Sequence, residues 1–231
     1  SAEADLFQVA CQANESEKGA GGYLTAFSTG NFTNVLITGN QASVEGGGMY
    51  VDNSTIKNTN VQVIGNVATD HGGGAYLTGS TFRLLNGVVG DNDPQELYFK
   101  EAGSSVNVQY SHLLGGVGGV VNAGDSDVQW NEGNLGGDDV WGIADNCPEI
   151  PASYEDSGSF FKSQVIDAGH PSSQYNDPDW KYCMEGLCCP SESGGLATFH
   201  PDSNRVRNDM GAFGGPGANW QPNPFLPTEE Q

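Results

Sequence analysis

Basic residues are scarce in this chain. Eight of its 231 residues are Lys or Arg, against 29 Asp and Glu, which gives a formal net charge of −21. Such a surface repels a phosphate backbone, so we expect no nucleic-acid partner. It suits a cationic partner instead, such as a divalent metal or a basic protein. Residues 122–231 hold 18 of the acidic residues and residues 1–121 hold 11, so cation binding is expected mainly in the C-terminal half.

Long apolar runs are also missing. No hydrophobic stretch approaches the ~18 residues that a membrane-spanning helix needs. The opening residues Ser-Ala-Glu-Ala-Asp have neither the basic start nor the apolar stretch of a signal peptide. We therefore expect a soluble chain without a membrane span, from which any signal peptide has been removed.

The sequence does contain a repeat of 26 residues. The same residue types return at this spacing in three successive segments, and the repeat is clearest over residues 19–93. The recurring columns are Gly21, Gly47 and Gly73; Gly22, Gly48 and Gly74; Ser28, Ser54 and Ser80; Thr29, Thr55 and Thr81; Ile37, Val63 and Val89; and Asn40, Asn66 and Asn92. Self-similarity at a fixed period of this length is typical of solenoid proteins.

The pattern inside each repeat is that of short strands. In Val61-Gln62-Val63 the two valines point to one side and the glutamine to the other. One repeat cannot bury its apolar face alone, but stacked repeats turn the Val and Ile columns into a continuous core. The repeated asparagines suit left-handed corners and can pair amide to amide between coils. We predict an all-β fold, a right-handed parallel β-helix (solenoid) with about 26 residues per coil and a loop-rich C-terminal cap.

The repeat also suggests how the chain is divided. Residues 1–121 are assigned to the β-helix coils, with shorter coils after Asp93-Pro94 because the 26-residue register ends there. Residues 122–217 are assigned to the last coils and an acidic, Cys-containing loop or cap segment. Residues 218–231 contain several prolines and no strand pattern, which predicts an extended tail.

Two motifs near the C-terminus resemble a known family. The segments Val-Ile-Asp-Ala-Gly at 165–169 and Asp-Met-Gly-Ala-Phe-Gly-Gly-Pro at 209–216 are similar to the ending of bacterial secreted right-handed β-helix proteins with a choice-of-anchor Q segment, which have the pectin-lyase-like fold. The resemblance implies export and a β-helix but no particular activity. The chain departs from the pattern at Gln164, where proline is usual, and in a Cys-containing insertion between Asp179 and Ser203.

Acidic residues in this C-terminal segment are candidate metal ligands. They lie around turns rich in Gly, Pro and Asn, and calcium binds six to eight hard oxygens on such irregular loops. The candidates are Asp167, Asp177, Asp179, Asp202 and Asp209. Alternatively, some of these carboxylates accept backbone hydrogen bonds and stabilise turns. Calcium is therefore expected as a cofactor only in this segment.

Candidate ligand-binding residues come from the repeat and from the loops. Lys57 and Arg83 are 26 residues apart, so we expect them side by side on one outer face, where they could bind an anionic sugar or pair with Asp52 or Asp70. Trp130, Trp141 and Trp180 fall outside the repeat, where they could stack on sugar rings. The alternative is that these tryptophans cover an open end of the β-helix.

The cysteines indicate disulfides rather than a metal site, because no matching pairs with metal-ligand spacing occur. Cys147, Cys183, Cys188 and Cys189 are the candidates, and with Cys11 the total is five. Pairing in an oxidising compartment favours an extracellular or cell-surface location. The sequence does not determine the connectivity or the fate of the odd thiol.

Two classes of function remain open. The first is a secreted or cell-surface, non-catalytic β-helix protein, a structural, adhesion or binding module that uses acidic loops, is stabilised by calcium and binds an extracellular polysaccharide or another surface protein. The second is an enzyme acting on an extracellular polysaccharide. It would be either a polysaccharide lyase, in which basic residues neutralise a uronate and remove its proton, or a glycoside hydrolase, which uses paired carboxylates. The small number of basic residues favours the first.

Overall fold

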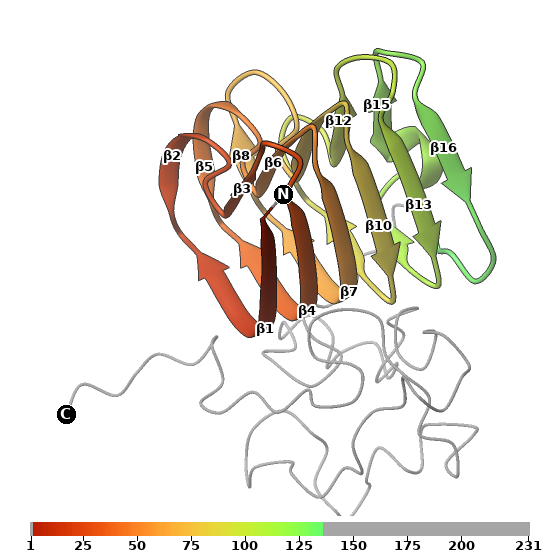
Figure 1. The fold of residues 1–231 in the computed structure, drawn as a ribbon, viewed down its shortest axis with the longest axis horizontal. Helices are drawn as coiled ribbons and strands as arrows, with labels where there is room; N and C mark the ends of the chain where they lie inside the picture. Colours follow the sequence, from red (N-terminus) through yellow and green to blue (C-terminus); the bar gives the residue numbers. More distant parts are fainter. Residues whose placement is uncertain (1, 136–231) are drawn as a thin grey trace, which may run out of the picture.

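The computed structural model describes residues 2–135, which form a parallel β-solenoid with about 26 residues per turn and almost no helix (Figure 1). Three parallel sheets run along the solenoid. The longest sheet contains, in spatial order, β1 (Glu3–Gln12), β4 (Thr29–Thr38), β7 (Thr55–Ile64), β10 (Thr81–Leu85), β13 (Ser105–Gln109) and β16 (Asp127–Trp130). In the same sheet β11 (Val88–Gly90) pairs with β7, and β14 (His112–Leu113) pairs with β11. The predicted parallel β-helix is therefore confirmed.

Two smaller sheets form the other sides of the coil. The five-stranded sheet contains β3 (Gly22–Leu24), β6 (Met49–Asp52), β9 (Ala75–Thr78), β12 (Leu97–Phe99) and β15 (Val120–Asn122). The three-stranded sheet contains β2 (Glu15–Lys18), β5 (Gln41–Glu45) and β8 (Val67–Ala68). A short 3-10 helix, η1 (Gly116–Gly119), precedes β15.

The coil length follows the sequence repeat and then shortens. Glu3 pairs with Thr29, and Thr29 with Thr55, at steps of 26 residues. After Thr81 the step falls to 24, to Ser105, and then to 22, to Asp127. The prediction of tighter coils after Asp93-Pro94 is therefore confirmed for the described part of the chain.

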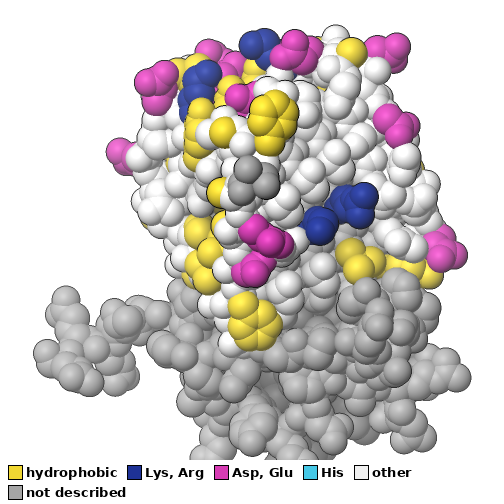
Figure 2. Space-filling view, in the orientation of Figure 1, with side chains coloured by type: hydrophobic (Ala, Val, Ile, Leu, Met, Phe, Trp, Pro, Cys, Tyr) yellow, Lys and Arg dark blue, Asp and Glu magenta, His cyan; other side chains and the backbone are white. Residues whose placement is uncertain are grey.

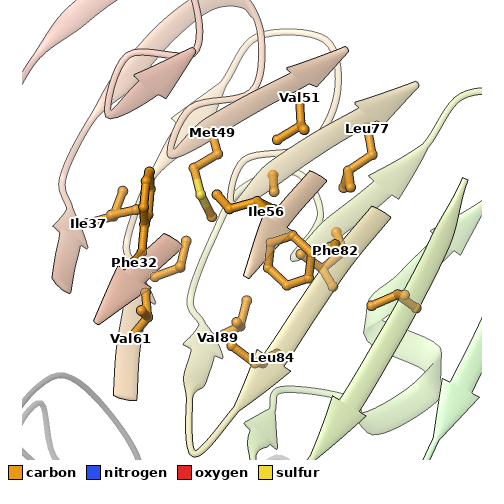
Figure 3. Packing of buried hydrophobic residues seen from close by; sticks show 14 of the residues in the cluster. Phe32, Ile37, Met49, Val51, Ile56, Val61, Leu77, Phe82, Leu84 and Val89 are labelled. Carbon is orange, nitrogen blue, oxygen red and sulfur yellow. The ribbon is translucent and has the colours of Figure 1, made fainter. Parts of the chain in front are cut away.

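The core is the set of inward side chains between the sheets. Val61 and Val63 are fully buried in it, as the alternation predicts. Figure 3 shows Met49, Ile56 and Phe82 directed into the same interior from different strands. Apolar side chains occupy the equivalent inward positions in successive coils, so each coil covers the apolar surface of the next one.

The two glycine columns permit close contact between coils. A Cβ added at Gly47 would lie 2.4 Å from the carbonyl oxygen of Val67, and one at Gly48 would lie 2.4 Å from that of Gly74. Neither glycine has a positive φ. Their role is thus to bring backbones together, whereas Gly46, with φ of 69°, occupies the left-handed region.

The asparagines divide into two columns with different roles. Asn34, Asn60 and Asn86 adopt left-handed φ values of 54–56° at a bend in the coil. Asn40 and Asn66 are not left-handed, so the expectation that the amide-pairing asparagines occupy left-handed corners is wrong. The left-handed positions in that turn are instead the preceding glycines, because glycine adopts that conformation without a steric penalty.

Candidate functional site

One broad surface of the solenoid is covered by regular columns of polar side chains. We call the outward side of β4, β7, β10 and β13 the outer face. Thr29, Thr55, Thr81 and Ser105 form its first column and Asn31, Lys57, Arg83 and Asn107 its second. These side chains are exposed or half-buried, while their inward neighbours Ile56 and Phe82 are fully buried. Strand alternation therefore presents hydroxyl, amide and cationic groups in rows.

Lys57 and Arg83 lie at the centre of the outer face. They are direct register partners on the adjacent strands β7 and β10, and both side chains are exposed. Figure 2 shows Lys and Arg side chains gathered in small patches on the described surface, one of them with acidic side chains close by. The sequence correctly predicted that these two cations lie side by side.

The expected ion pairs of these two cations are absent. Among residues 2–135 the ion pair present is Lys18–Glu45, with 2.7 Å between Nζ and Oε2. Asp52 instead accepts hydrogen bonds from Thr25 and Asn53. Lys57 and Arg83 therefore have no ion-pair partner among residues 2–135, and they place two adjacent positive charges on the outer face of a strongly acidic chain.

Lys18 shows how another cation of the solenoid is used. It pairs with Glu45 and lies 5.0 Å above the ring of Tyr50. The hydrogen bond to Glu45 raises the pKa of Lys18. Burial acts to raise the pKa of Glu45, but hydrogen bonds from Lys18 and Tyr76 outweigh it and lower that pKa. Lys18 thus has a structural partner, whereas the two cations of the outer face have no ion-pair partner among residues 2–135.

Beneath this ion pair runs a column of stacked aromatic rings. Tyr23, Tyr50, Tyr76 and Tyr98 stack with centroid distances of 5.0, 5.1 and 5.5 Å, and His71 stacks on Tyr98 at 4.2 Å. Tyr76 is almost fully buried, and burial raises its pKa. Sequence reasoning did not single out this column, although the tyrosines that follow the glycines at 21–22, 46–48 and 72–74 are the signal for three of its rings.

A buried ladder of side-chain amides runs parallel to the core. Asn14 donates from Nδ2 to Asn40 Oδ1 at 2.9 Å, Asn40 to Asn66 at 2.8 Å and Asn66 to Asn92 at 2.9 Å. Each Oδ1 of the last three residues also accepts the backbone N–H of the preceding asparagine. The predicted amide pairing between coils is confirmed.

The ladder ends at a buried carboxyl group. Asn92 donates from Nδ2 to Oε2 of Glu96 at 2.6 Å. Glu96 is 7% exposed and lines an open hollow of about 280 Å³ beside η1, together with Pro94 and Leu114. Burial raises the pKa of Glu96 to about 7, with hydrogen bonds from Asn92 acting in the opposite direction. Sequence reasoning missed Glu96 because it lies just beyond the point where the 26-residue register ends.

Of the predicted tryptophans, Trp130 lies in the described segment. It is the last residue of β16, is partly buried and packs against the hydrophobic core cluster. This position matches the alternative that a tryptophan covers the last coil, and ligand binding by Trp130 stays a prediction. Cys11 is free and half-buried, and burial raises the pKa of its thiol.

The remaining predicted site residues lie outside the described residues. These are the ligand-binding candidates Trp141 and Trp180, the metal ligands Asp167, Asp177, Asp179, Asp202 and Asp209, and the disulfide candidates Cys147, Cys183, Cys188 and Cys189. Within residues 2–135, no group of three His, Cys, Asp or Glu side chains could hold a metal ion.

The segment from residue 2 to 135 also has no helix long and apolar enough to cross a membrane. Comparison with protein-family models, with curated proteins and with solved structures finds no match for this chain. The resemblance to the choice-of-anchor Q group therefore stays a prediction from the two motifs. The described structure shows that the chain contains a parallel β-solenoid.

Proposed function

We propose that this protein is a non-catalytic binding module of the extracellular space or cell surface, and that its outer face binds an anionic polysaccharide. The main support for this proposal is the exposed pair of Lys57 and Arg83, which has no ion-pair partner among the described residues. A cation pair without an ion-pair partner in the described part of a chain of net charge −21 favours a ligand that supplies negative charges.

The shape of the outer face favours a polymer over a small molecule. Adjacent strands lie about 4.8 Å apart, so Lys57 and Arg83 can bind negatively charged groups on neighbouring sugar units. Threonine, serine and asparagine side chains extend on both sides of the pair along the solenoid. These groups donate and accept hydrogen bonds, as sugar hydroxyls require.

The alternative function is a polysaccharide lyase. Lys57 or Arg83 would then remove a proton from a uronate while the other cation neutralises its carboxylate. Along the same column, Asp5 is the nearest carboxylate in register, two strands away from Lys57. We favour binding because no described acid or metal cluster completes such a site beside the pair.

Replacing both cations by alanine is expected to weaken binding of polygalacturonate by about tenfold to a hundredfold, since each exposed charge-assisted contact contributes about 1 kcal/mol. The matched control is Lys100→Ala, which removes an exposed cation outside the outer face. Isothermal titration calorimetry of the full chain, repeated at higher salt, measures the affinities. Ultraviolet absorbance of unsaturated products in the same samples tests for lyase turnover.

Three results would contradict the proposal. Equal loss of affinity in Lys57→Ala/Arg83→Ala and in Lys100→Ala would show non-specific attraction. Equal affinity for neutral dextran would show that charge is not recognised. Turnover that disappears in the double variant would establish the lyase instead.

Calcium bound by the acidic C-terminal segment is the second part of the proposal. Its support is the set of five Asp candidates and the Asp177-Pro178-Asp179 spacing. Chelation with EDTA is expected to lower the melting temperature of the full chain, and added calcium, but not magnesium, should restore it. A melting temperature unchanged by chelation excludes a structural calcium site.

A further inference from the structure

The first coil of the solenoid presents an open end. Within residues 2–135, β1, β2 and β3 are each the terminal strand of their sheet. The backbone N–H and C=O groups that point away from the next coil therefore have no strand to pair with in the described structure. Such an edge is a template for the addition of another strand.

The apolar side chains of this coil are incompletely covered. Leu6, Val9 and Cys11 are half-buried, whereas their partners in the second coil, such as Val35 and Ile37, are fully buried. Larger apolar side chains are exposed at the same end: Phe7 is 56%, Tyr23 54% and Phe27 73% exposed. Tyr23 is also the exposed end of the tyrosine stack, so another ring could continue that stack.

The charge of this end is acidic. Glu3 and Asp5 project from β1, and Glu15 and Glu17 from β2; all four are exposed. Oxygen atoms of Glu3 and Asp5 accept hydrogen bonds from Nδ2 of Asn31 at 2.9 and 2.8 Å. A carboxylate has about four acceptor sites, so each can accept a further donor from the opposite side. Figure 2 shows acidic and apolar side chains next to each other on the described surface.

We propose that the open end of the first coil binds an extended segment of a partner protein in which basic and apolar side chains alternate. The columns of β1 specify its side chains. Lys or Arg stands opposite Glu3 and Asp5, an aromatic residue opposite Phe7, and aliphatic residues opposite Ala4 and Leu6, whose column continues into the core. Backbone pairing with β1 supplies affinity, and the carboxylates select the basic partner. This surface borders the outer face, because Asp5 lies in the same column as the outer-face cations, but the proposal does not depend on that pair.

The test uses the full chain and a fluorescent peptide of about ten residues, the length of β1, built around Lys-Val-Lys-Leu-Tyr. Two control peptides are used. The first carries Glu in place of Lys, and the second carries proline at alternate positions, which prevents strand pairing. The variant Glu3→Lys/Asp5→Lys reverses the charge of the edge without altering inward residues. Its matched control, Asp127→Lys/Glu132→Lys, makes the same charge change at exposed positions in the last described coil.

Wild-type protein and the Asp127→Lys/Glu132→Lys control are expected to bind the Lys peptide with similar affinity, and Glu3→Lys/Asp5→Lys about tenfold or more weakly, because opposed like charges are strongly unfavourable. Hydrogen exchange should show protection of the β1 amides on binding. Equal weakening in both double variants, binding of the proline peptide, or unprotected β1 amides would overturn the proposal. So would a solution dimer with β1 already protected, because a second copy would then occupy the edge.

Discussion

Replacing Asn66 by alanine is expected to lower the free energy of unfolding by about 3–5 kcal/mol, since unsatisfied buried polar groups cost about 1–3 kcal/mol each. The Asn66 side chain is completely buried and takes part in four hydrogen bonds. It accepts from the backbone and side chain of Asn40 and donates to Ile37 and Asn92. Alanine removes all four hydrogen bonds and leaves buried partner groups on the two neighbouring coils without them. Urea denaturation followed by circular dichroism measures the loss.

Asn14→Ala is the matched control for this prediction. Asn14 is the exposed end of the same ladder, and its side chain donates one hydrogen bond to Asn40. Its removal is expected to lower the free energy of unfolding by less than about 1 kcal/mol, because water can solvate the groups that are left. Similar losses in the two variants would mean that the buried ladder contributes no more than an exposed hydrogen bond.

Much of the fold was predictable because solenoids repeat their physical requirements at a constant spacing. Each coil needs inward Val or Ile, an amide for the ladder and glycine where backbones approach closely. Residues such as Val63, Asn66 and Gly47 therefore stand in columns that the sequence displays directly. The same spacing placed Lys57 beside Arg83, because register partners in a parallel sheet share one face.

The first coil was harder to detect in the sequence, because different residue types occupy its left-handed and ladder-flanking positions. Gln8, with φ of 53°, occupies the left-handed position at which Asn34 lies in the next coil. Asn14 belongs to the amide ladder, but the left-handed residue that precedes it is Ala13, where Gly39 precedes Asn40. A repeat detected by residue identity thus begins later than the repeat formed by backbone geometry.

The polar surroundings of the candidate sites could not be predicted from spacing alone. The bends of the coil decide which acidic side chain lies close enough to a cation to pair with it. Asp52, for example, lies on β6 of the five-stranded sheet, whereas Lys57 lies on a different sheet. Glu96 replaces an asparagine as the final acceptor of the ladder after the coil has shortened. A repeat pattern in the sequence cannot reveal this substitution of Glu for Asn, because it occurs in one coil and not in the others.

The buried carboxyl of Glu96 is expected to make the stability of this protein fall as the pH rises from about 4.5 to about 7. Because burial raises its pKa from 4.5 to about 7, the folded state retains a proton in this range that the unfolded state releases. Stability decreases with pH wherever the folded state binds more protons. The stabilisation is therefore fully present below pH 4.5 and is lost by about pH 7, an effect of roughly 3 kcal/mol.

Glu96→Gln isolates this effect, because glutamine retains an oxygen that accepts from Asn92 Nδ2 and stays neutral at every pH. Below pH 4.5 the variant and the wild type should have similar free energies of unfolding, whereas above pH 7 the variant should be more stable by roughly 3 kcal/mol. Glu132→Gln, at an exposed carboxylate, controls for the removal of one negative charge from an acidic chain. Chemical denaturation across this pH range measures all three proteins. If the difference between Glu96→Gln and the wild type does not change with pH, Glu96 ionises equally readily in the folded and unfolded states, and the ladder does not end at a neutral acid.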